Sequence, residues 1–282
     1  MYYYHVDVFS DKALAGNGLT VIFYDEKMET KYMQDIAKEF KQFETIFLRQ
    51  VGDRRFRARI FTVEEELDFA GHPILGAAAA IHEKLYAKEK NAIMTFELNN
   101  KVLAAESIQR DGHFQITMNQ GVPEFLGTVD GAVKDTFLQA LNLTANDLHD
   151  TLPMEVVSTG LPYLIVPISS GLEQAKISIK NLEEHLNKVN AKFVYVLYVP
   201  GMEGRTWDNL GEIEDVATGS AAGPTGAYLC KWGICKEAEN IIINQGSFVG
   251  RPSKIKVFTE QTTGEMKVVG DVKVIVKGDF LV

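Results

Sequence analysis

The pattern of apolar and polar positions along the chain predicts many short strands and few helices. Apolar and polar residues alternate with a period of two in most of the segments expected to be strands. In residues 54–61, for example, Phe56, Ala58 and Ile60 share one face and three arginines share the other, which is most simply a solvated face of the sheet. We expect strands at residues 3–9, 19–24, 46–49, 54–61, 92–98, 102–108, 114–118, 154–158, 163–168, 193–199, 205–208, 240–244, 254–259, 266–269 and 272–276. The residues Ala15–Gly18 are expected to form a turn between the first two strands.

Two uncharged runs predict buried helices, because a helix that is apolar all round has no face for solvent. A glycine followed by a polar residue opens each helix: Gly71 and His72 in the first, Gly219 and Ser220 in the second. The first amides of a helix have no internal partner and favour anions, so each opening is a candidate site for a carboxylate. The simplest alternative is that these residues only cap the helices and bind no ligand. The two runs are FAGHPILGAAAA at residues 69–80 and AAGPTGAYLC at residues 221–230.

The two runs lie about half a chain apart and suggest a duplicated unit. A glycine- and proline-containing segment at Gln120–Gly131 is expected to separate an N-terminal half, residues 1–120, from a C-terminal half, residues 130–282. In this division, the last strand of the chain packs either with the C-terminal half or back on the N-terminal half. Amphipathic helices are expected at residues 30–40, capped by Thr30, at 133–143 and at 181–189. If the halves face each other, both helix openings reach one ligand in the cleft between them.

Composition narrows the possible functions. Hydrophobic residues make up 46% of the chain and charged residues 24%, and the formal net charge is −9, which disfavours nucleic acid or an anionic membrane as a partner. The N-terminus has no signal-peptide pattern, and no apolar run has the length of a membrane span, so we expect a cytoplasmic protein. Cys230 and Cys235 are expected to be reduced, buried thiols.

The chain lacks GxGxxG, P-loop, GxSxG and HExxH motifs, which disfavours nucleotide-binding folds, hydrolases and zinc sites.

Acid–base chemistry remains, and it requires titratable groups in a partly dry site. Glu44 is flanked by apolar residues where a helix gives way to a strand, and an apolar pocket raises the pKa of a glutamate toward neutrality. The alternative is that Glu44 is an ordinary glutamate on the exposed face of a strand. Of the six histidines, only His72 lies in a loop of the kind that builds sites. Asp215 precedes the second core helix, where it orients another group, binds a substrate amine or simply interacts with the helix dipole.

Several motifs resemble those of the PhzF family, which is named for an enzyme of phenazine biosynthesis and shares the fold of diaminopimelate epimerase. The resemblance covers both halves of the chain in the family order. It rests on DVFSDKALAGNG at residues 7–18, FETIF at 43–47, RIFTVEEELDFAGHPILGAA at 59–78, EDVATGSAAGPTGAYL at 214–229 and QGSFVGRPSKI at 245–255.

The resemblance implies an α+β fold of two pseudo-symmetric halves, each a curled antiparallel sheet or open barrel around one central buried helix. It implies that Glu44 is the general acid/base. It also implies a homodimer and a substrate site between the halves. Diaminopimelate epimerase carries two thiols at the helix openings, where this chain has Ala70 and Thr218, so a two-thiol racemisation is not expected. The substrate-binding residues implied are Gly71, His72, Asp215, Gly219 and Ser220.

We therefore expect a cofactor-independent, metal-free isomerase that shifts a proton on a small carboxylated substrate. One alternative is an epimerase or racemase acting at a single carbon, which needs two opposed acid/base groups. Another is a non-catalytic small-molecule binding protein on the same scaffold. Phe43 stands where the family usually has a serine, and the added bulk beside Glu44 predicts a specificity that differs from that of the phenazine enzyme.

Overall fold

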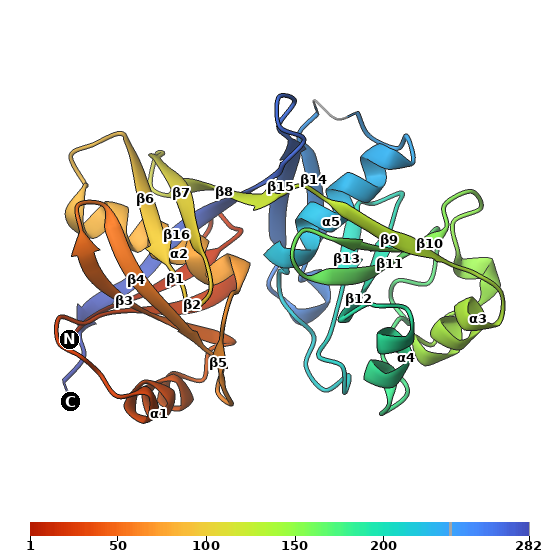
Figure 1. Ribbon diagram of the computed structural model, residues 1–282, viewed down its shortest axis with the longest axis horizontal. Helices are drawn as coiled ribbons and strands as arrows, with labels where there is room; N and C mark the ends of the chain where they lie inside the picture. Colours follow the sequence, from red (N-terminus) through yellow and green to blue (C-terminus); the bar gives the residue numbers. More distant parts are fainter. Residues whose placement is uncertain (237–238, 282) are drawn as a thin grey trace. The chain divides into compact units, whose positions relative to one another are not determined.

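The computed structural model describes residues 1–236 and 239–281, and it divides into two compact units (Figure 1). Unit 1 contains Met1–Asn119 together with the segment from Val269 onward, and unit 2 contains Gln120–Val268. The long strand β16 (Met266–Asp279) therefore begins in unit 2 and continues in unit 1. None of the helices in the described residues is long and apolar enough to span a membrane.

Unit 1 is built on a closed sheet of eight of the described strands. They are hydrogen bonded in the order β1-β2-β3-β4-β6-β7-β8-β16, and β16 returns to pair with β1. The pairs β2–β3 and β4–β6 are parallel, so the sheet is mixed. The strands are β1 (Tyr2–Val8), β2 (Asn17–Phe23), β3 (Glu44–Gly52), β4 (Arg55–Phe61), β6 (Asn91–Glu97), β7 (Val102–Gln109) and β8 (Phe114–Gly121), with the short β5 (Glu66–Leu67) beside β4.

Helix α2 (Gly71–Leu85) is the core of unit 1, and every residue from Gly71 to His82 is buried. It packs on β1, β2, β3 and β7 with small side chains such as those of Ala77 to Ala80. A Cβ atom on Gly76 would lie 2.4 Å from Leu19 Cδ2, so this glycine sets how closely the helix approaches β2. Helix α1 (Thr30–Phe40) covers the outer face of the sheet, where Met33 and Ile36 pack on Phe47 and Phe61.

Unit 2 repeats the plan of a sheet with one buried helix. Its strands are ordered β9-β10-β11-β12-β13-β14-β15 and continue to the first residues of β16. Helix α5 (Gly219–Lys231) packs on β10, β11 and β15, and Gly226 permits its approach to Val257. Helices α3 (Gly131–Ala140) and α4 (Leu182–Lys188) belong to a second apolar cluster. The strands are β9 (Glu124–Val129), β10 (Met154–Ser158), β11 (Pro162–Ile168), β12 (Phe193–Tyr198), β13 (Glu203–Arg205), β14 (Ile241–Gln245) and β15 (Ser253–Thr259).

The predicted fold class is confirmed, including one buried helix in each unit, while several local predictions are wrong. Thr30 is the first helical residue and Glu29 is the N-cap, and the Thr30 hydroxyl accepts a hydrogen bond from Arg59. Asn17 and Gly18 pair with β1 as part of a strand, and Gly16, at φ 73°, and Leu14, at φ 63°, are left-handed residues of the connection before it.

Two further differences concern glycine-rich segments. Residues 120–131 contain the edge strand β9, whose first five residues are exposed on both faces and so show no alternation. The two strands expected near the C-terminus are the single strand β16. Its interruption, Gly270, fits against the Phe9 ring, because a Cβ atom there would lie 2.8 Å from Phe9 Cδ1. Cys230 and Cys235 form no disulfide within the described residues and are half-buried rather than buried.

Candidate active site

Glu44 and His72 meet at the opening of helix α2. Glu44 is the first residue of β3, and His72 is the second residue of α2. Glu44 Oε2 lies 3.2 Å from His72 Nε2, and the two side chains are only 12% and 6% exposed. Distance permits a hydrogen bond between these two atoms but their alignment does not, so a small rotation of either group makes or breaks the contact. The pair is therefore a nearly dry acid–base site.

Burial sets the charge on this pair. Desolvation lowers the pKa of His72 from 6.5 to about 3, because a buried imidazolium loses its hydration. An ionised Glu44 opposes this shift, but burial is the larger effect. The imidazole is therefore neutral near pH 7, and the pair carries at most one charge, on Glu44. A neutral imidazole hydrogen bonds to a carboxylate or a carboxylic acid, so it supports Glu44 in both protonation states.

The start of α2 adds backbone donors to this site. Gly71, the first helical residue, is buried, and the N-cap residue Ala70 makes no side-chain capping bond. The first amides of α2 have the partial positive charge of a helix N-terminus. The structure brings Glu44, Gly71 and His72 together in unit 1, as the sequence predicts.

The opening of α5 in unit 2 is organised differently. Asp215 Oδ2 accepts a hydrogen bond of 2.5 Å from the Thr218 hydroxyl. Gln245 donates to the same hydroxyl at 2.9 Å and to the Asp215 carbonyl oxygen at 2.9 Å, and it accepts from the Thr218 amide at 3.1 Å. Thr218 is the N-cap residue, but its hydroxyl serves Asp215 and does not cap the helix. This network holds Asp215 in place just before the helix.

Gly219 and Ser220 begin α5, and each of them also forms a hydrogen bond. The Gly219 carbonyl oxygen accepts a hydrogen bond of 2.8 Å from Gln120, and Ser220 Oγ lies 2.7 Å from the Tyr163 hydroxyl. The structure therefore brings Asp215, Gly219 and Ser220 together in unit 2. All six residues predicted for the site lie at one of the two helix openings, three in each unit.

Sequence reasoning missed the glutamines that organise the second opening. Gln245 hydrogen bonds to Tyr195, Thr218 and Asp215 from the end of β14, and Gln120 reaches α5 from the end of β8. Gln245 opens one of the motifs quoted above, which was the available signal. Its partners lie about thirty or more positions away in the chain, so only the folded sheet places it beside Thr218.

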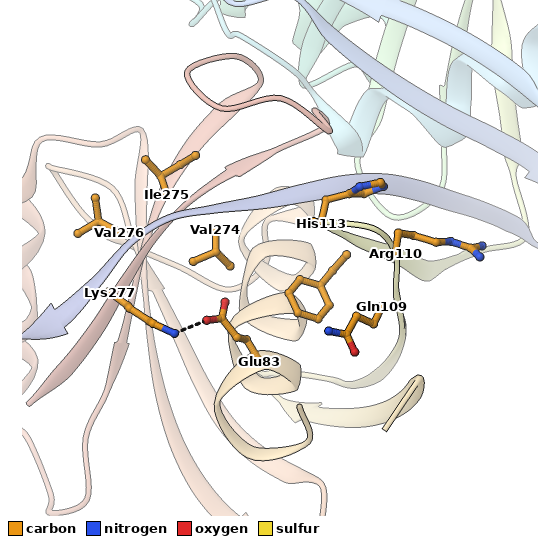
Figure 2. Close-up of a pocket in the computed structure, with 10 residues that line it drawn as sticks. Glu83, Gln109, Arg110, His113, Val274, Ile275, Val276 and Lys277 are labelled. Carbon is orange, nitrogen blue, oxygen red and sulfur yellow. Dashed lines mark hydrogen bonds and ion pairs between the residues drawn. The ribbon is translucent and has the colours of Figure 1, made fainter. Parts of the chain in front are cut away.

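A separate cavity of about 470 Å³ lies in unit 1 near the other end of α2. Figure 2 shows it between α2, the β7–β8 turn and β16, with an ion pair between Glu83 and Lys277 at its edge. Glu83 lies eleven positions after His72, or about 16 Å along the helix. None of the predicted site residues lines this cavity. Among the described residues, no group of three or more histidine, cysteine, aspartate or glutamate side chains is arranged to hold a metal ion.

Comparisons with known proteins identify the family of the chain. The family model of phenazine biosynthesis-like proteins (PhzC-PhzF) matches residues 6–279. A solved structure of a predicted epimerase from Pseudomonas aeruginosa is 44% identical, with a TM-score of 0.93 over 100% of this chain and 99% of that one. A trans-2,3-dihydro-3-hydroxyanthranilate isomerase from Pseudomonas fluorescens is 31% identical over 89% of this chain and 87% of its own length.

More distant structures show the same fold. A proline racemase-like protein from Agrobacterium radiobacter is 12% identical, with a TM-score of 0.64, and covers 100% of this chain and 93% of its own. The relatives named by activity are isomerases, which supports an enzyme and not a non-catalytic binding protein. The chain belongs to the phenazine biosynthesis-like family, PhzC-PhzF, and is an isomerase.

Proposed function

We propose that this isomerase moves a proton between two carbon atoms of a small carboxylated metabolite, with Glu44 as general acid and base and without a cofactor. The observation that carries the proposal is the buried contact of 3.2 Å between Glu44 and His72 at the opening of α2. A carboxyl group in a dry site is suited to proton transfer at carbon, and a neutral imidazole positions it.

The reaction needs no other reagent. Glu44 removes a proton from a substrate carbon, and the electrons of that C–H bond form a new double bond. The electrons of the existing double bond then take a proton from Glu44 at another carbon. Substrate and product have the same formula, and Glu44 returns to its starting state. The His72 imidazole stays neutral and holds the Glu44 carboxyl in both steps.

Gly71, His72, Asp215, Gly219 and Ser220 are proposed to bind the substrate. The first amides of α2 and α5 have the partial positive charge of a helix N-terminus and suit a carboxylate, and Asp215 suits an amino group. That one substrate molecule is bound by both openings stays a prediction. Phe43 precedes Glu44 and is 37% exposed, so it is proposed to contact the substrate and alter its selection.

The first test uses trans-2,3-dihydro-3-hydroxyanthranilate, the compound in the names of several relatives. The protein is incubated with it in deuterated water and followed by ultraviolet absorbance and proton NMR. A double-bond shift predicts a new absorbance spectrum and, where Glu44 exchanges its proton with solvent, deuterium at the carbon that gains hydrogen. If this compound is unchanged, the same assay is applied to other small unsaturated carboxylates. Products that differ from their substrates only at a stereocentre would contradict the double-bond shift.

The second candidate reaction is epimerisation, favoured by the solved structure described as a predicted epimerase. Epimerisation at one carbon usually needs a second acid/base group. Asp215, the carboxylate at the α5 opening, is instead engaged by Thr218 and by the Ala217 amide. This difference favours a single acid/base group. Deuterium confined to one inverted stereocentre would identify the epimerase.

The predicted homodimer is a separate proposal. Light scattering coupled to size-exclusion chromatography measures the mass in solution, and a homodimer gives twice the 31.4 kDa of the chain. A mass of one chain at micromolar concentration would contradict it.

A further inference from the structure

The arginines on the outer face of β3 and β4 are not equivalent. Arg59 is paired with Glu66 through two hydrogen bonds, and the two side chains are 16% and 20% exposed. Arg55 is paired with Glu97. Arg57 donates only to uncharged oxygens, the carbonyls of residues 97 and 98 and the side chain of Asn99. The charge of Arg57 therefore has no carboxylate partner among the described residues.

Arg49 has even fewer partners. Among the described residues, no hydrogen bond or ion pair involves its guanidinium, and its Nε is a buried donor without an acceptor. Arg49 stands directly opposite Arg57 in the antiparallel β3–β4 pair. Directly opposed side chains of this kind have Cβ atoms about 5 Å apart, and like charges there are destabilising. Two arginines that form no ion pair within the described residues thus leave the sheet side by side, on a protein whose net charge is −9.

Tyr24 completes the row on the third strand. Phe23 pairs with Leu48 in the parallel β2–β3 ladder, and the Tyr24 amide donates to the Leu48 carbonyl oxygen, so Tyr24 lies beside Arg49. Tyr24 is only 7% exposed. Its pKa is raised by burial and lowered, in order of size, by Arg49, Arg59 and Arg57, which agrees with a hydroxyl close to these guanidinium groups. The row Tyr24–Arg49–Arg57 therefore combines a partly dry phenol with two unpaired cations.

We propose that the row Tyr24–Arg49–Arg57 binds a small dianion with tetrahedral oxygens, that is, a phosphate or phosphate monoester. Two guanidinium groups match two negative charges, and their planar donors suit phosphate oxygens. The Tyr24 hydroxyl supplies a further donor. The strongly acidic remainder of the chain disfavours an extended polyanion, so the ligand is a small molecule. An anion here also removes the cost of the opposed Arg49 and Arg57 charges.

Calorimetry with inorganic phosphate tests the site on the full chain in a phosphate-free buffer. Wild type is expected to bind phosphate, and Arg49→Gln is expected to bind at least about tenfold more weakly, because it removes charge-assisted hydrogen bonds. Arg55→Gln is the matched control, because Arg55 lies on the same face of β4 but is already paired with Glu97. It is expected to keep wild-type affinity. A phosphate monoester such as glycerol 3-phosphate distinguishes a metabolite site from one for free phosphate by its tighter binding.

Melting temperatures provide an independent test of the proposed phosphate site. Without phosphate, Arg49→Gln is expected to melt at or above the wild-type temperature, because it relieves a like-charge pair; a purely structural arginine would give a lower one. Tyr24→Phe provides a second variant that removes only the hydroxyl, and weaker phosphate binding is expected. Failure of wild type to bind millimolar phosphate overturns the proposal. So does equal weakening by Arg49→Gln and Arg55→Gln, or binding of acetate as tightly as phosphate.

Discussion

The openings of the two buried helices have the same backbone design but different side chains. In α2 the first turn carries His72 against Glu44, with Nε2 and Oε2 3.2 Å apart but poorly aligned. In α5 the residues before the first turn, Asp215 and Thr218, form a tight network with Gln245. Both helices begin with a buried glycine, and in neither does the side chain of the N-cap residue make a capping bond.

The difference indicates a division of labour. A loosely aligned, nearly dry pair of titratable groups is suited to moving a proton, because its geometry and charge change easily. A network with several short hydrogen bonds is suited to holding a fixed shape for binding. We therefore propose that the α2 opening carries the proton transfer in addition to binding substrate, and that the α5 opening contributes to binding alone. The predictions below test this assignment, beginning with the largest expected effect.

The largest effect is expected from Glu44→Gln. Glutamine keeps the size of the side chain but cannot take up a proton, so kcat should fall by about 10²- to 10⁴-fold. Glu155→Gln is the matched control: Glu155 is also buried, at 2% exposed, but it is paired with Lys231 and Trp232. It should lose thermal stability and keep its kcat. An equal loss of kcat in both variants would mean that the effect is structural.

His72→Asn should lower kcat by on the order of 10- to 100-fold, because it removes the group that positions Glu44. His82 offers a comparison on the same helix. Its ring nitrogens are already satisfied by Ser107 Oγ at 2.7 Å and the Glu89 carbonyl oxygen at 3.0 Å, so it has a structural role. His82→Asn should affect stability more than turnover. The opposite ranking of the two variants would remove His72 from the site.

Acid should destabilise unit 1 through His72. Its pKa is 6.5 when unfolded and about 3 when folded, so the unfolded state binds the proton first as the pH falls. The stabilising effect of the neutral imidazole is complete above pH 6.5 and is lost as the pH falls from 6.5 toward 3. The slope approaches about 1.4 kcal/mol per pH unit at most. Denaturant unfolding between pH 7 and 4.5 measures it, and His72→Asn should show a smaller slope than wild type; equal slopes would contradict the assignment.

The smallest expected effect separates two threonines of the α5 region. Thr218→Val removes the hydroxyl that donates to Asp215 and accepts from Gln245, and it should reduce the free energy of unfolding by about 1–3 kcal/mol. Thr225→Val should be neutral or stabilising, because the buried Thr225 hydroxyl has no hydrogen-bond partner in the described structure. Chemical denaturation of both variants measures the two changes in the free energy of unfolding. Equal effects would mean that the network at the α5 opening adds no rigidity.

Much of the fold could be predicted from local patterns. The uncharged runs identified α2 and α5 as buried helices, and alternation placed strands such as β4. Edge strand β9 was missed because its residues are exposed and do not alternate. The parallel pairs β2–β3 and β4–β6 also could not be predicted, because strand partners are set by long-range packing.

The site, too, could be predicted only in part, because contacts between residues far apart in the chain depend on the fold. Glu44 and His72 were each identified from sequence, but their contact depends on β3 and α2 meeting in the closed sheet. The low pKa of His72 depends on complete burial, which no neighbouring residue in the chain reveals. Arg57 was assigned to a solvated face and Arg49 to an ordinary strand, and only the β3–β4 register shows that they oppose each other.

The most direct test of the division of labour compares Glu44→Gln with Asp215→Asn by solvent deuterium incorporation into a substrate that wild type converts. The account predicts that Glu44→Gln binds this substrate but incorporates deuterium at least about 100-fold more slowly. It predicts that Asp215→Asn incorporates deuterium at close to the wild-type rate once substrate is saturating, with an increased KM. Near-normal incorporation in Glu44→Gln, with a large loss at saturation in Asp215→Asn, would place the acid–base chemistry at the α5 opening and contradict the account.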